Sequence, residues 1–445
     1  MEPESQGAGT GVKPFTPQEA REIIQTLRQP AVFTDMVGDW PAMRWTSVYL
    51  SSLLGENLLR FRIGRRKAQL APQFETECEY VNGTLQQFHD WIRSTSQNLP
   101  EPFDNFNISD YWGYADYKYL SAIFHNRPEI LQDILWADFG FPGRDGKEST
   151  LWVGSSGANT PCHIDSYGCN LVLQVEGRKT WHLFPPEDTT YLYPTRIPYE
   201  ESSIFSKVNV VHPDWCRFPL FSKARPYVVT LHPGQVLYVP RRWWHYVESI
   251  DDITVSINTW TELDSDHEAR VEEAITRMVV CAFKSTDLSS NIQDWLNPTE
   301  GEVTSHETNL LYLNQALAMY ADHEAKKVED VQRTQDPPLK RNKLTTDTAS
   351  NVDLSVSSPP PFGRHLLSVM PSPPRSDLRG AGTDNIAFAG DQCQALNSET
   401  TQVVSSQWHE TASPNQSVTS DDVLECLVNP QVIHLVSRLL LKKIS

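Results

Sequence analysis

The sequence predicts a mainly β fold, a barrel or jelly roll of two sheets, with flanking α-helices and a long polar tail. Between about residues 150 and 262, short apolar runs such as "NLVLQV" and "QVLYVP" alternate with turn residues such as Gly177 and the Pro233-Gly234 pair. Short strands at regular spacing are typical of closed or double-sheet β folds. Helical periodicity occurs on both sides of this region, and the tail is rich in Ser and Pro.

Changes in composition set the expected domain boundaries. We expect a disordered N-terminus over residues 1–12 and a folded domain over 13–285, with its β core at about 150–262. A helical extension is expected over 286–328. The Ser/Pro-rich residues 329–420 bury too little apolar area to offset chain entropy, so we expect a disordered linker. An amphipathic helix is expected over 421–445.

Local signals define the elements before the β core. Thr16 and Pro17 are typical of a helix start in "TPQEAREIIQTL". "PAVFTDMV" indicates a strand, and "MRWTSVYLSSLLG" indicates a short helix closed by Gly55. "PEILQDIL" indicates another helix.

The run "RFRIGRRK" at residues 60–67 is locally basic. Its alternation predicts a strand with Phe61 and Ile63 pointing inward and Arg60 and Arg62 pointing to solvent.

Two helices are expected after the β core, in "HEARVEEAITRMVVCAF" and "TNLLYLNQALAMYADHEAKK". Each has one apolar face, which can pack on the core or form a homodimer interface beyond residue 265. The final stretch, "NPQVIHLVSRLLLKKIS", has a cap at Asn429 and an apolar stripe that can dock on a partner, a membrane surface or the core. The stripe consists of Val432, Leu435, Val436, Leu439 and Leu440.

Charge and hydropathy limit the function classes. The formal net charge is -18, which disfavours nucleic-acid binding because phosphate recognition requires concentrated Lys and Arg. The N-terminus lacks a secretory pattern, and no apolar run reaches the roughly 20 residues of a membrane helix. We therefore expect a cytoplasmic protein that binds no membrane.

Three residues form a candidate metal site. "TPCHIDSYGCN" places His163 two positions before Asp165, and "PGQVLYVPRRWWHYVES" supplies His245 after a turn and a strand. Two imidazoles and one carboxylate form the facial triad typical of non-haem Fe(II), which leaves coordination positions open. Strands far apart in sequence can face each other in a double-sheet barrel, so the separation is no obstacle.

Polar residues near these ligands suggest a bound anion. Lys179 follows "NLVLQV" and the tight "EGR" turn. An inward lysine would require an anionic partner such as a dicarboxylate, whereas an outward lysine would be solvated. Thr160, Asn170 and Asn258 also need partners inside a barrel, either a cosubstrate or the backbone.

Taken together, "TPCHIDSYGCNLVLQVEGRKTWHLFPPED", "YPTRIPYEESS" and "PGQVLYVPRRWWHYVES" resemble a JmjC domain of the small hydroxylase-like group. This group includes the asparaginyl hydroxylase that acts on hypoxia-inducible factor. The likeness covers about residues 13–283. With "YADYKYL", "DFGFPG" and "LNPTE", the whole chain resembles vertebrate proteins associated with small heat-shock proteins.

The resemblance implies a double-stranded β-helix of the cupin-like JmjC type that uses Fe(II) and 2-oxoglutarate. It implies that His163, Asp165 and His245 bind iron. It implies that the cosubstrate pocket is lined by Lys179, Thr160, Tyr119, Asn170 and Asn258. One extra residue between Asp165 and Asn170, relative to the asparaginyl hydroxylase, puts the substrate in doubt. The implied partner is a small heat-shock protein of the 27-kDa class or alpha-B crystallin.

Several functions are compatible with these features. The first is a protein hydroxylase, and the second is a non-catalytic adaptor for small heat-shock proteins, since fold does not fix function. A zinc-dependent cupin would use a further ligand, for which the sequence offers no candidate at matching spacing. Without a zinc-finger or histone-reader segment, histone demethylation is less favoured than protein hydroxylation.

Overall fold

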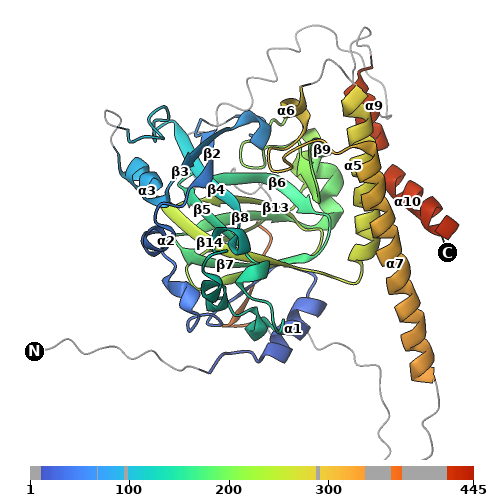
Figure 1. The fold of residues 1–445 in the computed structure, drawn as a ribbon, viewed down its shortest axis with the longest axis horizontal. Coiled ribbons are helices and arrows are strands. Elements are labelled where there is room, and N and C mark those ends of the chain that lie inside the picture. Colours follow the sequence, from blue (N-terminus) through green and yellow to red (C-terminus); the bar gives the residue numbers. More distant parts are fainter. Residues whose placement is uncertain are drawn as a thin grey trace, which may run out of the picture.

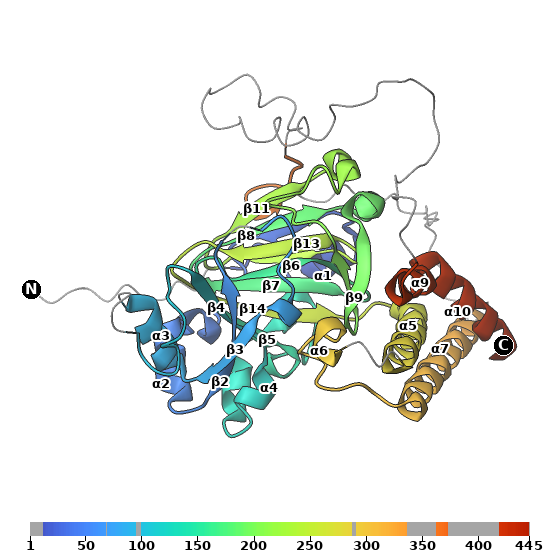
Figure 2. The same ribbon diagram turned by 90° about the horizontal axis from the view of Figure 1, so that it is seen from above.

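The computed structural model describes residues 12–67, 69–94, 99–286, 291–335, 362–372 and 418–444. Two antiparallel sheets form the centre of the molecule (Figure 1). The helices Ser47–Leu54 and Leu85–Arg93 lie at one side of the sheets, and the long helices of the C-terminal part lie at the other (Figure 2). The predicted mainly β core with flanking helices is confirmed.

The larger sheet, within the described residues, has the strand order β15-β1-β12-β7-β14-β5-β4-β2-β3. Its strands are β1 (Ala31–Phe33), β2 (Leu59–Arg65), β3 (Glu79–Gly83), β4 (Tyr111–Tyr119), β5 (Thr150–Ser155), β7 (Cys169–Glu176), β12 (Val236–Val239), β14 (Ile253–Thr261) and β15 (Leu366–Ser368). The smaller sheet has the order β11-β8-β13-β6-β10-β9. Its strands are β6 (Asn159–Asp165), β8 (Lys179–Phe184), β9 (Pro194–Glu200), β10 (Ser203–Ser206), β11 (Tyr227–Leu231) and β13 (Trp244–Ser249).

Consecutive core strands alternate between the two sheets. β6 lies in the smaller sheet, β7 in the larger and β8 in the smaller, and β12, β13 and β14 alternate in the same way. This alternation is the double-stranded β-helix expected from the sequence. It inserts β13 between β6 and β8, so residues distant in the chain become direct neighbours.

An apolar cluster joins the N-terminal helices to the larger sheet. The helices are α1 (Pro17–Thr26), α2 (Ser47–Leu54), α3 (Leu85–Arg93) and α4 (Leu120–Ile123). Short 3-10 helices connect the elements, namely η1 (Pro41–Arg44), η2 (Glu75–Glu77), η3 (Pro128–Asp133), η4 (Trp136–Phe139), η5 (Gly146–Glu148), η6 (Pro186–Leu192) and η7 (Pro219–Lys223). The predicted start of α1 at Thr16 and the predicted end of α2 at Gly55 are both confirmed. The helix expected in "PEILQDIL" is the 3-10 helix η3.

Arg62 corrects the prediction for the basic run. Its side chain is fully buried rather than solvated, and Nε lies 2.6 Å from Asp116 Oδ2. Nη2 donates to the backbone oxygen of Asn159 at 2.9 Å. Alternation along β2 does place Arg62 opposite Phe61 and Ile63, but that opposite face is also covered. The inference failed because period-two patterning does not reveal that both faces of a strand are buried.

The C-terminal helices form a bundle beside the sheets. They are α5 (Asp266–Thr286), α6 (Ile292–Trp295), α7 (His306–Gln335), α9 (Ser420–Leu427) and α10 (Pro430–Ile444). The predicted apolar face of α5, with Val271 and Ile275, packs against Leu313 of α7 and against Ile433 and Leu441 of α10. Part of the face proposed for a dimer is therefore covered within one chain, and dimerisation remains a prediction.

The apolar stripe predicted for α10 points mostly to solvent. Val432, Leu435, Val436 and Leu439 have exposed fractions of 39%, 59%, 37% and 54%. The helix packs on α5 through another face. No single described helix is long and apolar enough to cross a membrane, although α9 and α10 together, bent by 54°, reach the required length and composition.

A short strand lies within the region expected to be a disordered linker. β15 pairs with β1, where Leu366 is the partner of Phe33, and Leu366 is fully buried. His365 Nδ1 also lies 2.8 Å from Asp35 Oδ2. The expectation of disorder fails here because an open sheet edge and an apolar pocket order a segment that could not fold alone. Residues 329–335 of the expected linker instead continue helix α7 to Gln335. Residues 336–361 and 373–417 of the expected linker, and the N-terminal residues 1–11, lie outside the described residues.

Candidate metal and cosubstrate site

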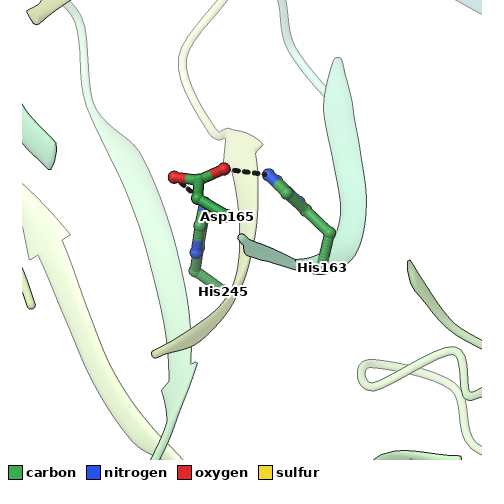
Figure 3. Close-up of side chains that lie close together, drawn as sticks. All are labelled: His163, Asp165 and His245. Carbon is green, nitrogen blue, oxygen red and sulfur yellow. Dashed lines mark ion pairs between the residues drawn. The ribbon is translucent and has the colours of Figure 1, made fainter. Parts of the chain in front are cut away.

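The three predicted metal ligands converge. His163 on β6 and His245 on β13 are direct partners across the two paired strands, and their ring centroids are 4.2 Å apart. Asp165 lies between their Nε2 atoms, with Oδ1 3.6 Å from His163 and Oδ2 4.0 Å from His245 (Figure 3). Each residue offers one ligand atom within 4.8 Å of the other two. This spacing can accommodate a metal ion.

Neighbouring groups hold these ligands in orientation. Nδ1 of His163 lies 2.9 Å from the Pro161 oxygen, and Nδ1 of His245 lies 3.0 Å from the Trp243 oxygen. A carbonyl only accepts, so Nδ1 of each ring carries the hydrogen and the Nε2 lone pair faces the site. The indole Nε1 of Trp260 donates to Asp165 Oδ2 at 3.1 Å.

The electrostatics favour ligands that are ready to bind a cation. Burial lowers the pKa of His245 from 6.5 to about 4, with the neighbouring His163 ring as the second cause. Burial alone would raise the pKa of Asp165, but the adjacent rings of His163 and His245 and the indole hydrogen of Trp260 hold it below its usual value. A neutral imidazole and an ionised carboxylate are the forms that bind metal.

Lys179 points inward, which answers the question left open by the sequence. It is 2% exposed, and Nζ donates to the Tyr114 hydroxyl at 3.1 Å and to Ser256 Oγ at 2.8 Å. Within the described chain, no carboxylate lies within ion-pair distance of Nζ. The charge of the Asp116 carboxylate favours the ammonium form of Lys179, but Asp116 is itself paired with Arg62. Burial therefore lowers the pKa of Lys179 from 10.5 to about 7.

Of the other residues predicted to bind the cosubstrate, three lie near Lys179 inside the cavity and one lies at its exposed edge. Thr160 is buried and lies within hydrogen-bonding reach of the Tyr114 hydroxyl. Asn258 Nδ2 donates to Asn170 Oδ1 at 2.9 Å. All three line one cavity of about 500 Å³ together with the triad and Lys179. Tyr119 also lines this cavity but is 58% exposed, with no described contact to Lys179.

Sequence reasoning missed Tyr114, Ser256 and Trp260. Tyr114 is 2% exposed and is the tyrosine that contacts Lys179. The alternating pattern of β4 could have indicated it, because Trp112, Tyr114 and Asp116 are two residues apart and therefore lie on the same face of the strand. A bulge in β4 between Ala115 and Lys118 changes that alternation before Tyr119. The prediction of Tyr119 did not anticipate this shift.

A second group of possible ligands joins α5 to α10. Nδ1 of His434 lies 2.7 Å from Glu272 and 3.8 Å from Glu268. These side chains are partly or fully exposed. Among the described residues, the group at the central site consists of His163, Asp165 and His245.

Comparisons with known proteins agree with this architecture. A cupin-like domain model matches residues 17–267. The chain is 50% identical over 460 residues to HSPB1-associated protein 1 of Bos taurus, covering 98% of this chain and 95% of the relative. It is 49% identical over 464 residues to that of Homo sapiens, with the same coverages. Lysine-specific demethylase 8 of Xenopus tropicalis is 26% identical over 249 residues, covering 54% of this chain and 49% of the relative. The chain therefore belongs to the cupin-like JmjC family and, within it, to the family of HSPB1-associated protein 1.

Proposed function

We propose that this chain is an Fe(II)- and 2-oxoglutarate-dependent oxygenase that hydroxylates a protein. One observation carries the proposal: a His-Asp-His triad shares a cavity with a buried lysine that has no anionic partner among the described residues. A lone buried ammonium is costly. A dicarboxylate held beside the triad would relieve that cost.

The residues divide between metal and cosubstrate. His163, Asp165 and His245 would hold Fe(II), and the donor set of two imidazoles and one carboxylate suits that ion. When bound, Fe(II) and 2-oxoglutarate would supply hydroxylation with dioxygen as the oxidant: one oxygen atom would enter succinate as 2-oxoglutarate loses carbon dioxide, and the other would enter a substrate C–H bond as a hydroxyl group.

The cosubstrate would be oriented by groups deep in the cavity. Lys179 would pair with the carboxylate farther from the metal, while Tyr114 and Ser256 keep its ammonium in place. Trp260 fixes the Asp165 carboxylate through its indole hydrogen. These contacts would fix the geometry of the bound groups, which is the contribution a protein makes to cofactor chemistry.

Anaerobic titration of the full-length protein with Fe(II) and 2-oxoglutarate tests the proposal. We expect a weak visible charge-transfer band with the wild type, its loss with His163→Ala, and its retention with His125→Ala, an exposed histidine outside the cavity. Succinate release in air should follow the same pattern across candidate peptides. The absence of both the band and succinate with the wild type would contradict the proposal.

A second candidate function is an adaptor for a small heat-shock protein, with a role in the stress response. Two observations favour it: the relatives named HSPB1-associated protein 1 match nearly the whole chain, and α10 exposes an apolar stripe. Exposed contiguous apolar surface is typical of protein interaction sites. A cytoplasmic location remains a prediction.

A pull-down with purified HSPB1 separates the two functions. We expect Leu435→Asp with Leu439→Asp to weaken capture strongly, because both changes place charges on the exposed stripe. His163→Ala should leave capture unchanged if the adaptor role requires no metal. Capture unaffected by the α10 changes would show that this stripe is not the contact surface.

A further inference from the structure

A second cavity lies outside the metal and cosubstrate site. It has a volume of about 340 Å³, and within the described residues it shares no lining residue with the central cavity. The two cavities meet different residues of β6: Thr160 and His163 line the central one, whereas Asn159 and Pro161 line the second. A ligand in the second cavity would therefore not take the place of the cosubstrate.

Two loops form the walls of this second cavity and are tied to each other. One follows β2 and the other follows β10. Asn209 Nδ2, in the loop after β10, donates to the backbone oxygen of Gln69, in the loop after β2, at 2.8 Å. Asn209 Oδ1 accepts hydrogen bonds from the backbone nitrogens of Val211 and His212 at 3.1 and 2.9 Å. One side chain thus holds both walls in place.

Three consecutive cations of the basic run line the second cavity, namely Arg65, Arg66 and Lys67. Among the described residues, no carboxylate lies within ion-pair distance of any of them. The lining contains one carboxylate, Glu248, whose Oε2 accepts a hydrogen bond from the Tyr246 hydroxyl at 2.8 Å. Three positive charges therefore face one negative charge, although the whole chain has a formal net charge of -18.

Arg66 is the anchored member of this group. Its Nε donates to the backbone oxygens of Ile108 and Tyr111 at 2.7 and 2.8 Å. Gly157 also lines the cavity, and a Cβ atom at this position would lie 3.1 Å from Arg66 Nη1. Burial lowers the pKa of the half-buried guanidinium. The guanidinium is therefore fixed through Nε, while its Nη1 end borders the cavity without an ion pair in the described structure.

Part of the lining is apolar, and this favours an organic ligand over a bare ion. Trp112, Val210 and Ile250 are among the lining residues, and Ile250 is 39% exposed. An inorganic anion would leave this apolar surface in contact with water. An anionic group attached to an organic molecule would cover part of it, which is favourable.

We propose that the second cavity binds a phosphomonoester, that is, a phosphate group attached to an organic molecule, with Arg65, Arg66 and Lys67 as its counter-ions. A guanidinium can donate to two phosphate oxygens in parallel, and a lysine adds a point charge. Such a phosphate carries nearly two negative charges at neutral pH, which matches the excess of positive charge in the lining. A phosphoserine of another protein and a free nucleotide both offer this chemistry.

Calorimetry with the full-length protein, without added metal or 2-oxoglutarate, tests this inference. The probes are the peptide Gly-Gly-Ser-Gly-Gly with and without a phosphate on its serine, and adenosine monophosphate and adenosine. We expect at least one phosphorylated probe to bind about tenfold or more tightly than its unphosphorylated counterpart. A preference confined to the peptide would identify a protein as the source of the phosphate, and one confined to adenosine monophosphate would identify a nucleotide.

Paired substitutions locate the binding in the second cavity. Arg65→Gln with Lys67→Gln should remove the preference, and both side chains are exposed, so the fold should be retained. The matched control, Arg44→Gln with Lys147→Gln, removes two exposed cations outside both cavities and should keep the preference. Lys179→Met should keep it as well, because Lys179 belongs to the central cavity.

Glu248→Gln guards against misfolding because a gain is expected. Removing the one carboxylate of the lining should tighten binding of the phosphorylated probe several-fold, which a damaged fold would not do.

The inference is overturned if no phosphorylated probe binds at millimolar concentration, or if the unphosphorylated probes bind equally well. It is also overturned if a folded protein with Arg65→Gln and Lys67→Gln keeps the preference, if the control pair or Lys179→Met loses it, or if Glu248→Gln does not tighten binding. None of these outcomes bears on the oxygenase proposal, whose test is the Fe(II)–2-oxoglutarate band.

Discussion

Replacing Lys179 with methionine should stabilise the protein when 2-oxoglutarate is absent. The side chain is fully buried, and its pKa falls from 10.5 to about 7 because burial disfavours the ammonium. Each pKa unit corresponds to about 1.4 kcal/mol, so the lysine costs roughly 4 kcal/mol at neutral pH. Methionine would remove the hydrogen bonds that Lys179 makes to Tyr114 and Ser256, at a cost of about 1–2 kcal/mol. The net expected gain is about 2 kcal/mol.

The sign of the pH dependence follows from the same shift. Because the folded protein releases this proton at lower pH than the unfolded chain, the unfolded chain holds more protons between about pH 7 and pH 10.5. The cost of the lysine therefore decreases as pH rises through this window. Relative to Lys179→Met, the wild type should gain roughly 2 to 3 kcal/mol between pH 7 and pH 9.

Urea unfolding of the full chain measures both effects. Lys147→Met, a change at an exposed lysine, is the matched control and should change the unfolding free energy by less than about 0.5 kcal/mol. Adding 2-oxoglutarate to the metal-loaded protein should stabilise the wild type more than Lys179→Met, which keeps the metal ligands but lacks the ammonium. A Lys179→Met protein less stable than the wild type at neutral pH, or a wild-type advantage that does not grow with pH, would refute the reasoning.

Three further outcomes are expected. The affinity for 2-oxoglutarate should fall by up to about tenfold per pH unit above about pH 7, as free Lys179 loses its proton; a flat calorimetric profile would count against the assigned role. Asp116→Asn should lower the urea unfolding free energy by about 3 kcal/mol, since it leaves Arg62 buried without its carboxylate; a change below about 1 kcal/mol would contradict this. Leu366→Ala should cost about 2 kcal/mol locally and speed hydrogen exchange of the Thr34 amide, which donates to the His365 oxygen; unchanged exchange would show that β15 does not protect this edge.

The convergence of the triad could be predicted from the sequence. His163 and Asp165 are close in the chain, and the strand-and-turn pattern around His245 is typical of the same barrel. The arrangement needs only the alternation of consecutive strands between two sheets, which the spacing of strands and turns indicates. Family resemblance supplied the rest of the assignment.

The faces of individual strands could not be predicted in the same way. Lys179 and Arg62 are both buried. The sequence did not decide whether Lys179 points inward or outward, and it predicted that Arg62 points to solvent. Period two separates the faces of a strand but does not say which face meets water, because that depends on elements added later in the chain. The bulge before Tyr119 and the strand at Leu366 depend on tertiary contacts that leave weak local signals.

The insertion of β13 between β6 and β8 has a consequence for biosynthesis. A nascent polypeptide leaving the ribosome carries His163 and Asp165 well before His245 emerges, and the strand bearing His245 must enter between two partners that are already synthesised. Loading with a metal ion must therefore follow the closure of this part of the sheet. A truncated translation product that stops before β13 would keep the His-x-Asp pair and lack the third ligand.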